Sequence, residues 1–299
     1  MGVFKQRTAT VRIYGITDFD QDGKDELAIY TFTFPECYFE FKISQIESDS
    51  PNSCYLKIPG ISKDTYKIFE EKQFAKYGKN QIVEIFCGYD RDEEMVYRGT
   101  VSRVRYHFDF GAQWMEIILD QNMKKYRVQK HSICIQKPTT VYEAVNIVCQ
   151  TFGYRFECLN PEDFKGINIR PMTFEGNIKQ CLDSILNKHM SYYVDIDNVV
   201  TFSKHKSISK SYTLLFDNGL IAYPILDTSK LEDGDIYNIR HKIIPSIAVG
   251  SVIKIPVGED GLFTDVDTGK YVEYIVEEFV SSFSPTQDIT EMECRRKNG

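Results

Sequence analysis

The most distinctive chemical pattern in the chain is the acidic run DFDQDGKDEL, which includes the carboxylates of Asp18, Asp20, Asp22 and Glu26. Oxygen ligands at alternate positions, with Gly23 where the loop must turn sharply, are typical of calcium-binding loops. Ile29 stands at the twelfth position, where an EF-hand supplies a bidentate glutamate, so a shorter DxDxDGxxEL loop between two strands fits better. These carboxylates, with a carbonyl near Lys24, are therefore the candidate calcium ligands. A solvated acidic hairpin loop, which Asp-Gly favours by itself, is the alternative.

Other residues that could do chemistry lack partners at the required spacing. The five histidines are far apart in the sequence, and none lies in an HExxH pattern. The adjacent acids Glu277 and Glu278 offer the residue types of a hydrolase, but neighbours on a strand point to opposite faces of the sheet. The sequence also contains no GxSxG, Walker or GxGxxG pattern. We therefore expect no enzymatic activity and no organic cofactor.

The eight cysteines form no CxxC pair and no zinc-type spacing with histidine. Most stand in apolar patterns such as IFCG and NIVCQTF, where a free thiol behaves as a small buried hydrophobe. This usage is typical of a protein that folds in a reducing cytoplasm.

Composition limits the classes of partner. A formal net charge of -7 argues against nucleic-acid recognition by phosphate neutralisation. The N-terminal residues begin an alternating pattern instead of a signal peptide, and no run of about 18 apolar residues predicts a membrane anchor. At 299 residues with 42% hydrophobic residues, the chain is long enough for two or three domains.

Periodicity predicts a β-rich chain with a small helical region in the middle. Alternating residues predict strands over 8–16 and 27–34, joined by the acidic loop. Apolar residues at helical spacing predict helices over 138–152, with a threonine cap and a stop at Gly153, and over 175–189. A hairpin turning at Asp197-Asn198 is expected to follow, and strands return after residue 211. No internal repeat is detectable in the sequence, although two β-rich blocks can share a fold without sharing sequence.

The order of these segments carries a resemblance. The segments, in chain order, are Gly60-Ile61-Ser62 followed by a short helix from SKDTY, Cys87-Gly88-Tyr89, Tyr97-Arg98-Gly99-Thr100-Val101, FEGNIKQCLDSILNKHMSYYVDIDNVVTFSK, NGLIAYPIL, HKIIPSIAVGSVIKIP and YVEYIVEEFVSSFSPTQDITEMECRRK. This ordered series covers most of the chain and resembles the baseplate hub proteins of phage tails and contractile injection systems.

The resemblance implies a mainly β fold with two tube-like β-barrel domains, at 1–123 and 211–299, flanking a small α+β domain at 124–210. It also implies a structural, non-enzymatic hub: a homotrimer whose six barrels form a pseudo-sixfold ring in the tail baseplate, assembled in the bacterial cytoplasm. Its implied partners are the central spike protein, the tail tube or distal tail protein, and the tape measure protein.

Two other functions remain compatible with the residues. A carbohydrate-binding tail adhesin predicts solvent-exposed aromatic side chains, which the 19 tyrosines and 20 phenylalanines could supply. A tail-associated cell-wall hydrolase requires a pair of carboxylates on a suitable scaffold.

Overall fold

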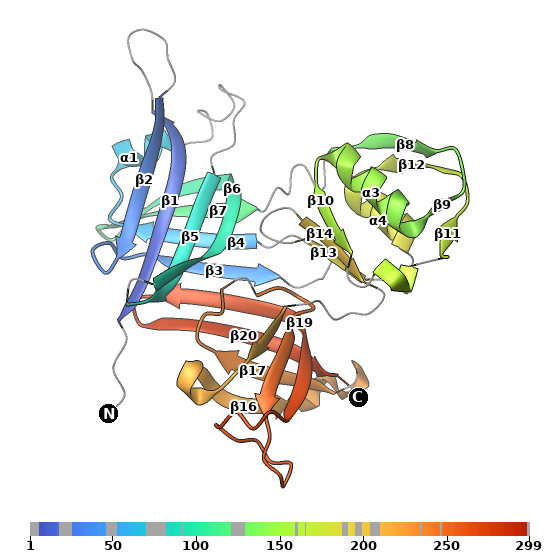
Figure 1. Ribbon diagram of the computed structural model, residues 1–299. Helices are drawn as coiled ribbons and strands as arrows, with labels where there is room; N and C mark the ends of the chain where they lie inside the picture. Colours follow the sequence, from blue (N-terminus) through green and yellow to red (C-terminus); the bar gives the residue numbers. More distant parts are fainter. Residues whose placement is uncertain are drawn as a thin grey trace.

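The computed structural model describes residues 6–17, 26–45, 53–69, 82–90, 92–120, 129–158, 161–164, 166–186, 191–194, 199–203, 210–233, 235–245 and 247–297. The predicted mainly β fold class, with a small α+β region in the middle of the chain, is confirmed. Strands from both β-rich parts of the sequence belong to one large sheet, whereas the middle region forms its own small sheets beside it (Figure 1).

The first block of the large sheet comes from the N-terminal part of the chain. Its strands are β1 (Arg7–Thr17), β2 (Glu26–Phe34), β3 (Glu40–Gln45), β4 (Ser53–Pro59), β5 (Ile82–Tyr89), β6 (Asp92–Asp109) and β7 (Ala112–Asp120). They lie in the order β3-β4-β7-β6-β5-β1-β2, and every neighbouring pair is antiparallel. A short helix, α1 (Lys63–Ile68), follows β4 and begins where the Ser62 side chain accepts a hydrogen bond from the Thr65 backbone.

The second block comes from the C-terminal part. Its strands are β15 (Ser211–Thr213), β16 (Leu220–Leu226), β17 (Ile236–His241), β18 (Val252–Pro256), β19 (Tyr271–Ser284) and β20 (Gln287–Arg296), with 3-10 turns η3 (Phe216–Asn218) and η4 (Thr228–Asp233). The order is β16-β17-β20-β19, with β18 on β19 and β15 on β18. The two blocks share one hydrophobic core, so the predicted domain limits at 123 and 211 stay a prediction.

The middle region has a separate core. It contains α3 (Val141–Phe152), α4 (Ile178–Leu186), η2 (Pro161–Phe164) and the strands β8 (His131–Ile135), β9 (Thr139–Thr140), β10 (Arg155–Cys158), β11 (Asn168–Ile169), β12 (Met172–Gly176), β13 (Ser191–Val194) and β14 (Val199–Ser203). β13 and β14 pair antiparallel as predicted, although the turn residues between them lie outside the described part of the chain.

Local chemistry explains where the two longer helices begin. Thr140 and Glu143 form a reciprocal capping box, and Gly153 ends α3 at φ 70°. The predicted helix over 175–189 begins three residues late, because Phe174–Gly176 pairs with β8. Asn177 then caps α4: its side-chain oxygen accepts from the Gln180 backbone N–H at 2.9 Å. Among the described residues, no helix has the length and apolarity needed to cross a membrane.

Candidate assembly interface

The seam between the two blocks is a pair of strands far apart in sequence. β3 and β19 run antiparallel with Phe41 opposite Phe283 and Gln45 opposite Phe279 (Figure 1). β19 pairs with two different strands along one edge. Its first half pairs with β18 of its own block, and its second half pairs with β3 of the other block. Backbone hydrogen bonds therefore continue across the seam, and the blocks are joined as one sheet.

Aromatic rings fill the core side of this seam. Phe283 is 1% exposed and lies 5.3 Å from the ring of Phe41, 5.7 Å from Phe39 and 5.4 Å from Phe34. The Phe41 pair is stacked and the Phe34 pair is edge-on, both favourable arrangements of aromatic quadrupoles. One side chain of the second block thus contacts three rings of the first.

A polar contact ties the blocks together at the β19–β20 turn. Arg7 donates a hydrogen bond to the Pro285 carbonyl at 2.5 Å and lies 3.5 Å from the Asp288 carboxylate. The Tyr89 hydroxyl donates a hydrogen bond to the same carboxylate. Burial and this bond to Asp288 raise the pKa of Tyr89. Deeper in the seam, the side-chain oxygen of Gln45 accepts the Val249 backbone N–H at 3.1 Å.

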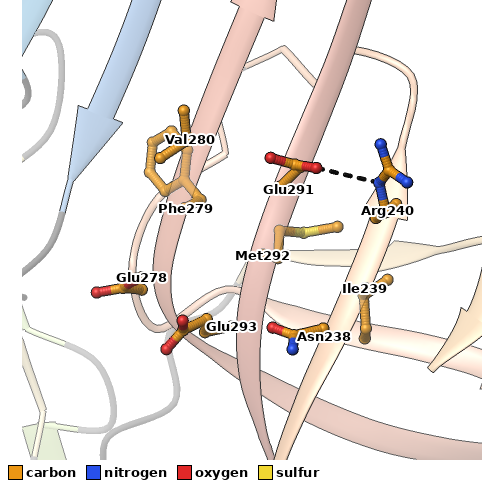
Figure 2. Close-up of a pocket in the computed structure, with 9 residues that line it drawn as sticks. All are labelled: Asn238, Ile239, Arg240, Glu278, Phe279, Val280, Glu291, Met292 and Glu293. Carbon is orange, nitrogen blue, oxygen red and sulfur yellow. Dashed lines mark ion pairs between the residues drawn. The ribbon is translucent and has the colours of Figure 1, made fainter. Parts of the chain in front are cut away.

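A groove of about 450 Å³ opens over three strands of the second block, β17, β20 and β19 (Figure 2). A β-bulge between Val276 and Glu278 inserts one residue into β19. Because of this bulge, Glu277 and Glu278 point to the same face of the sheet, whereas the sequence predicted opposite faces. Glu277 binds Arg295 with two hydrogen bonds, at 2.7 and 3.1 Å, while Glu278 lies opposite Glu293, which is on the same face of β20 as Arg295.

The groove is acidic, and its charges are mostly neutralised within it. Arg240 pairs with Glu291 at 3.1 Å, and Lys230 pairs with Glu293. Burial and the nearby Glu293 carboxylate raise the pKa of Glu278.

The carboxylates predicted to bind calcium fall mostly outside the described residues. Asp18, Asp20 and Asp22 are not described, and Glu26 is placed only by its backbone, opposite Thr17 at the start of β2. The calcium loop therefore stays a prediction, as does the alternative of a solvated loop. Within the described residues, no three histidine, cysteine, aspartate or glutamate side chains gather into a group that could hold a metal.

The cysteines lie mainly where the apolar patterns suggested. Cys54, Cys87, Cys149, Cys181 and Cys294 are buried, and none of the eight cysteines forms a disulfide. Burial raises the pKa of Cys87 and of Cys149 to about 12, which keeps these thiols protonated and unreactive.

The sequence did not single out the exposed aromatic residues at the tip of the β6–β7 hairpin. Phe110 has φ 44° and is fully exposed, and Phe108 is 70% exposed. A positive φ is unusual for a bulky residue, and asparagine is the common choice at this position of a two-residue turn. The signal available in the sequence was the dipeptide Phe110-Gly111, with an aromatic residue in the place that Asn-Gly turns give to asparagine.

Solved structures share this fold. A tail protein from Neisseria meningitidis is similar with a TM-score of 0.59 and 10% identity, over 97% of this chain and 97% of that chain. The 43 kDa tail protein of prophage MuSo2 from Shewanella oneidensis gives a TM-score of 0.57 at 9% identity, over 96% and 97%. An E. coli type VI secretion component, described as structurally similar to T4 bacteriophage tail proteins gp27 and gp5, gives 0.57 at 10% identity, over 88% of this chain and 74% of that chain.

No protein-family model matches the sequence, and no curated protein matches it either. At identities near 10% the structural likeness establishes a common fold over nearly the whole chain.

Proposed function

We propose that this chain is a structural component of a phage tail or a phage-tail-like particle, and that it serves as the baseplate hub. The observation that supports this most directly is the likeness of its whole fold to tail proteins, over 97% of both chains in one case. A similar fold in a component of the type VI secretion system also supports the proposal.

The two-block architecture suits a hub because of symmetry. A trimer in which each copy contributes two β-rich blocks presents six similar units around one axis. Such a ring can meet a sixfold tail tube on one side and a threefold spike on the other. The seam supports this role because β3–β19 pairing and the Phe283 cluster hold both blocks of a copy in one rigid unit. Proposed partners are the spike, the tube or distal tail protein, and the tape measure protein, in the tail baseplate.

We propose that the protein acts by assembly, without a chemical step. The acidic groove supports this, because two of its carboxylates, Glu291 and Glu293, are paired with Arg240 and Lys230. Ion pairs of this kind on an open sheet face are typical of a solvated surface.

The test is the mass of the purified protein by light scattering over a concentration series, with negative-stain images of the same sample. A threefold particle with an open centre and a pseudo-sixfold outline is the expected result. Because a hub can require its spike to close, the measurement is repeated on protein co-expressed with the spike of the same particle. Absence of association and of rings in both samples would refute the hub, and a glycan screen would then test the adhesin.

A further inference from the structure

The two blocks repeat the same strand arrangement. Five strands of the first block lie in the order β3-β4-β7-β6-β5, and five strands of the second lie in the order β16-β17-β20-β19-β18. All neighbours in both series are antiparallel, and the strands follow one another along the chain in the same sequence. β6 therefore corresponds to β19, and β3 corresponds to β16.

The correspondence holds at the level of single residues. The β6–β7 and β19–β20 hairpins both close on a two-residue turn, with Asp109 opposite Ala112 and Ser284 opposite Gln287. In each hairpin the register shifts once. The first residue after the shift is Arg103 in the β6–β7 hairpin and Glu278 in the β19–β20 hairpin. Both lie six residues before the closing pair. Phe108 consequently corresponds to Phe283.

The same alignment carries through to the neighbouring strands. Glu116 of β7 lies opposite Lys57 of β4, and the corresponding Glu291 of β20 lies opposite Arg240 of β17. Lys57 therefore corresponds to Arg240, and an acidic residue faces a basic one in both blocks. One strand further, Ile43 pairs with Cys54 and Leu226 pairs with the corresponding Tyr237. Ser44 therefore corresponds to Asp227.

The contact between β19 and β3 is formed within the chain, whereas the corresponding strands β6 and β16 do not pair with each other. The segment Phe279–Phe283 of β19 pairs with β3. The corresponding segment Val104–Phe108 of β6, here called the arm, pairs only with β7 among the described strands. β16, which corresponds to β3, has β17 as its one strand neighbour in the described part of the chain.

Side-chain exposure follows the same division. Phe283 is 1% exposed in the formed junction, whereas Phe108 is 70% exposed on the arm. On the open strand, Leu226 is 37% exposed, whereas the corresponding Ile43 is 2% exposed. The apolar residues that the formed junction covers are thus uncovered at the open one.

An aromatic cluster lies beside the open strand. Tyr223 and Pro224 of β16 together occupy the place of Phe41 in β3, and the Tyr223 ring lies 4.9 Å from Phe216 and 5.3 Å from Phe263. Phe41 belongs to the cluster that receives Phe283. The second block therefore carries a comparable group of rings without a fourth ring from an arm.

We propose that the arm of one copy pairs antiparallel with β16 of a second copy, in the register that β19 and β3 use within each chain. This rests on the ring of the proposed function and names the contact that forms it. Phe108 then packs against Tyr223 of the second copy, as Phe283 packs against Phe41. Within the chain, Val280 lies opposite Ser44. In the proposed contact the corresponding residues are Arg105 and Asp227, which carry opposite charges. The alignment was not chosen to produce this pairing.

The contact is head to tail, since the arm and β16 are different parts of the chain. Such a contact closes into a ring when the rotation between copies permits, and otherwise gives open chains. β16 holds one more residue than β3 and includes Pro224 within its bulged stretch, so its backbone offers fewer hydrogen bonds than β3 does. Side chains, chiefly Phe108 and the Arg105–Asp227 pair, are therefore expected to supply most of the affinity.

The experiment measures self-association of the purified chain by sedimentation velocity over a concentration series. Phe108→Ser is expected to weaken association by about 30-fold or more, the effect of losing an aromatic anchor. Val266→Ser is the matched control, because Val266 is 62% exposed, close to the 70% of Phe108, but lies in the loop after β18. Arg105→Glu and Asp227→Arg are each expected to weaken association, and the double variant is expected to restore it.

A mixing experiment tests the head-to-tail geometry. Phe108→Ser blocks the arm, and Leu226→Lys blocks β16, because Leu226 corresponds to Ile43, which is buried in the formed junction. Each variant alone is expected to be monomeric, while their mixture is expected to stop at dimers, since one intact arm and one intact edge remain. Circular dichroism of each variant confirms that it is folded.

The outcomes separate this inference from the hub itself. Rings that form as well with Phe108→Ser as with the wild type would overturn the inference and leave the hub standing. Dimers or open chains that depend on Phe108 and Arg105, without a threefold ring even in the sample co-expressed with the spike, would support the inference and overturn the hub. A wild-type chain that stays monomeric at every concentration would overturn the inference.

Discussion

The pair Phe283 and Phe108 allows the seam to be tested by substitution at two corresponding positions. Phe283→Ala removes a ring that is 1% exposed and contacts three other rings, so the loss combines burial, the cavity and the ring contacts. For a buried phenylalanine these together amount to about 3–5 kcal/mol of unfolding free energy. Phe108→Ala removes a ring that is 70% exposed in the monomer, and its cost is expected to be below about 0.5 kcal/mol.

The assay is urea unfolding at a concentration at which all variants are monomeric. The chain has a single tryptophan, Trp114, which lies in the first block, so its fluorescence reports that block while circular dichroism reports both. If the seam couples the blocks, the two signals coincide in the wild type and separate in Phe283→Ala, where the second block loses its anchor. Phe283→Leu, which keeps most of the volume, is expected to cost less than about 1.5 kcal/mol.

Two results would refute the reasoning. A loss below about 1 kcal/mol for Phe283→Ala would show that the aromatic cluster contributes little to joining the blocks. Equal losses for Phe283→Ala and Phe108→Ala in the monomer would show that the two positions do not differ in burial as the structure has them.

Three further substitutions test local features. Phe110→Asn is expected to raise the unfolding free energy by about 1 kcal/mol, measured by urea unfolding, because asparagine tolerates φ 44° better. Thr140→Ala removes the cap of α3 and is expected to cost about 1 kcal/mol in the same assay, with Thr151→Ala as a control. Burial and Glu293 raise the pKa of Glu278 in the folded state, so ionisation above pH ~4.3 opposes folding. Glu278→Gln is expected to stabilise by a few tenths of a kcal/mol at pH 7 and to have no effect at pH 3, below both pKa values; the same gain at both pH values would contradict this.

Much of the local structure was readable from the sequence. Strands over 8–16 and 27–34 were predicted from alternation, and the structure places β1 and β2 there within one residue at each end. The threonine cap and Gly153 located both ends of α3. These features depend on contacts between residues close in the chain, so the pattern of side chains contains the information that forms them.

Single-residue details of the strands were less readable. Adjacent Glu277 and Glu278 were expected on opposite faces, and the bulge in β19 overturned that expectation. A bulge is set by how two paired strands accommodate each other, and the sequence of one strand does not reveal it. The helix predicted from residue 175 began later because pairing with β8 took its first residues.

The sequence by itself determined a mainly β chain with a helical middle region, and its segment order already resembled tail hub proteins. Only the tertiary structure decided that β3 pairs with β19, which brings Phe41 beside Phe283. It alone also showed that two blocks without detectable sequence repeat share one strand order. The physical reason is that strand pairing uses backbone groups common to all residues, while side chains need only keep an apolar inner face. Many sequences meet that requirement, so the partner of each strand is set by the packing of the whole sheet.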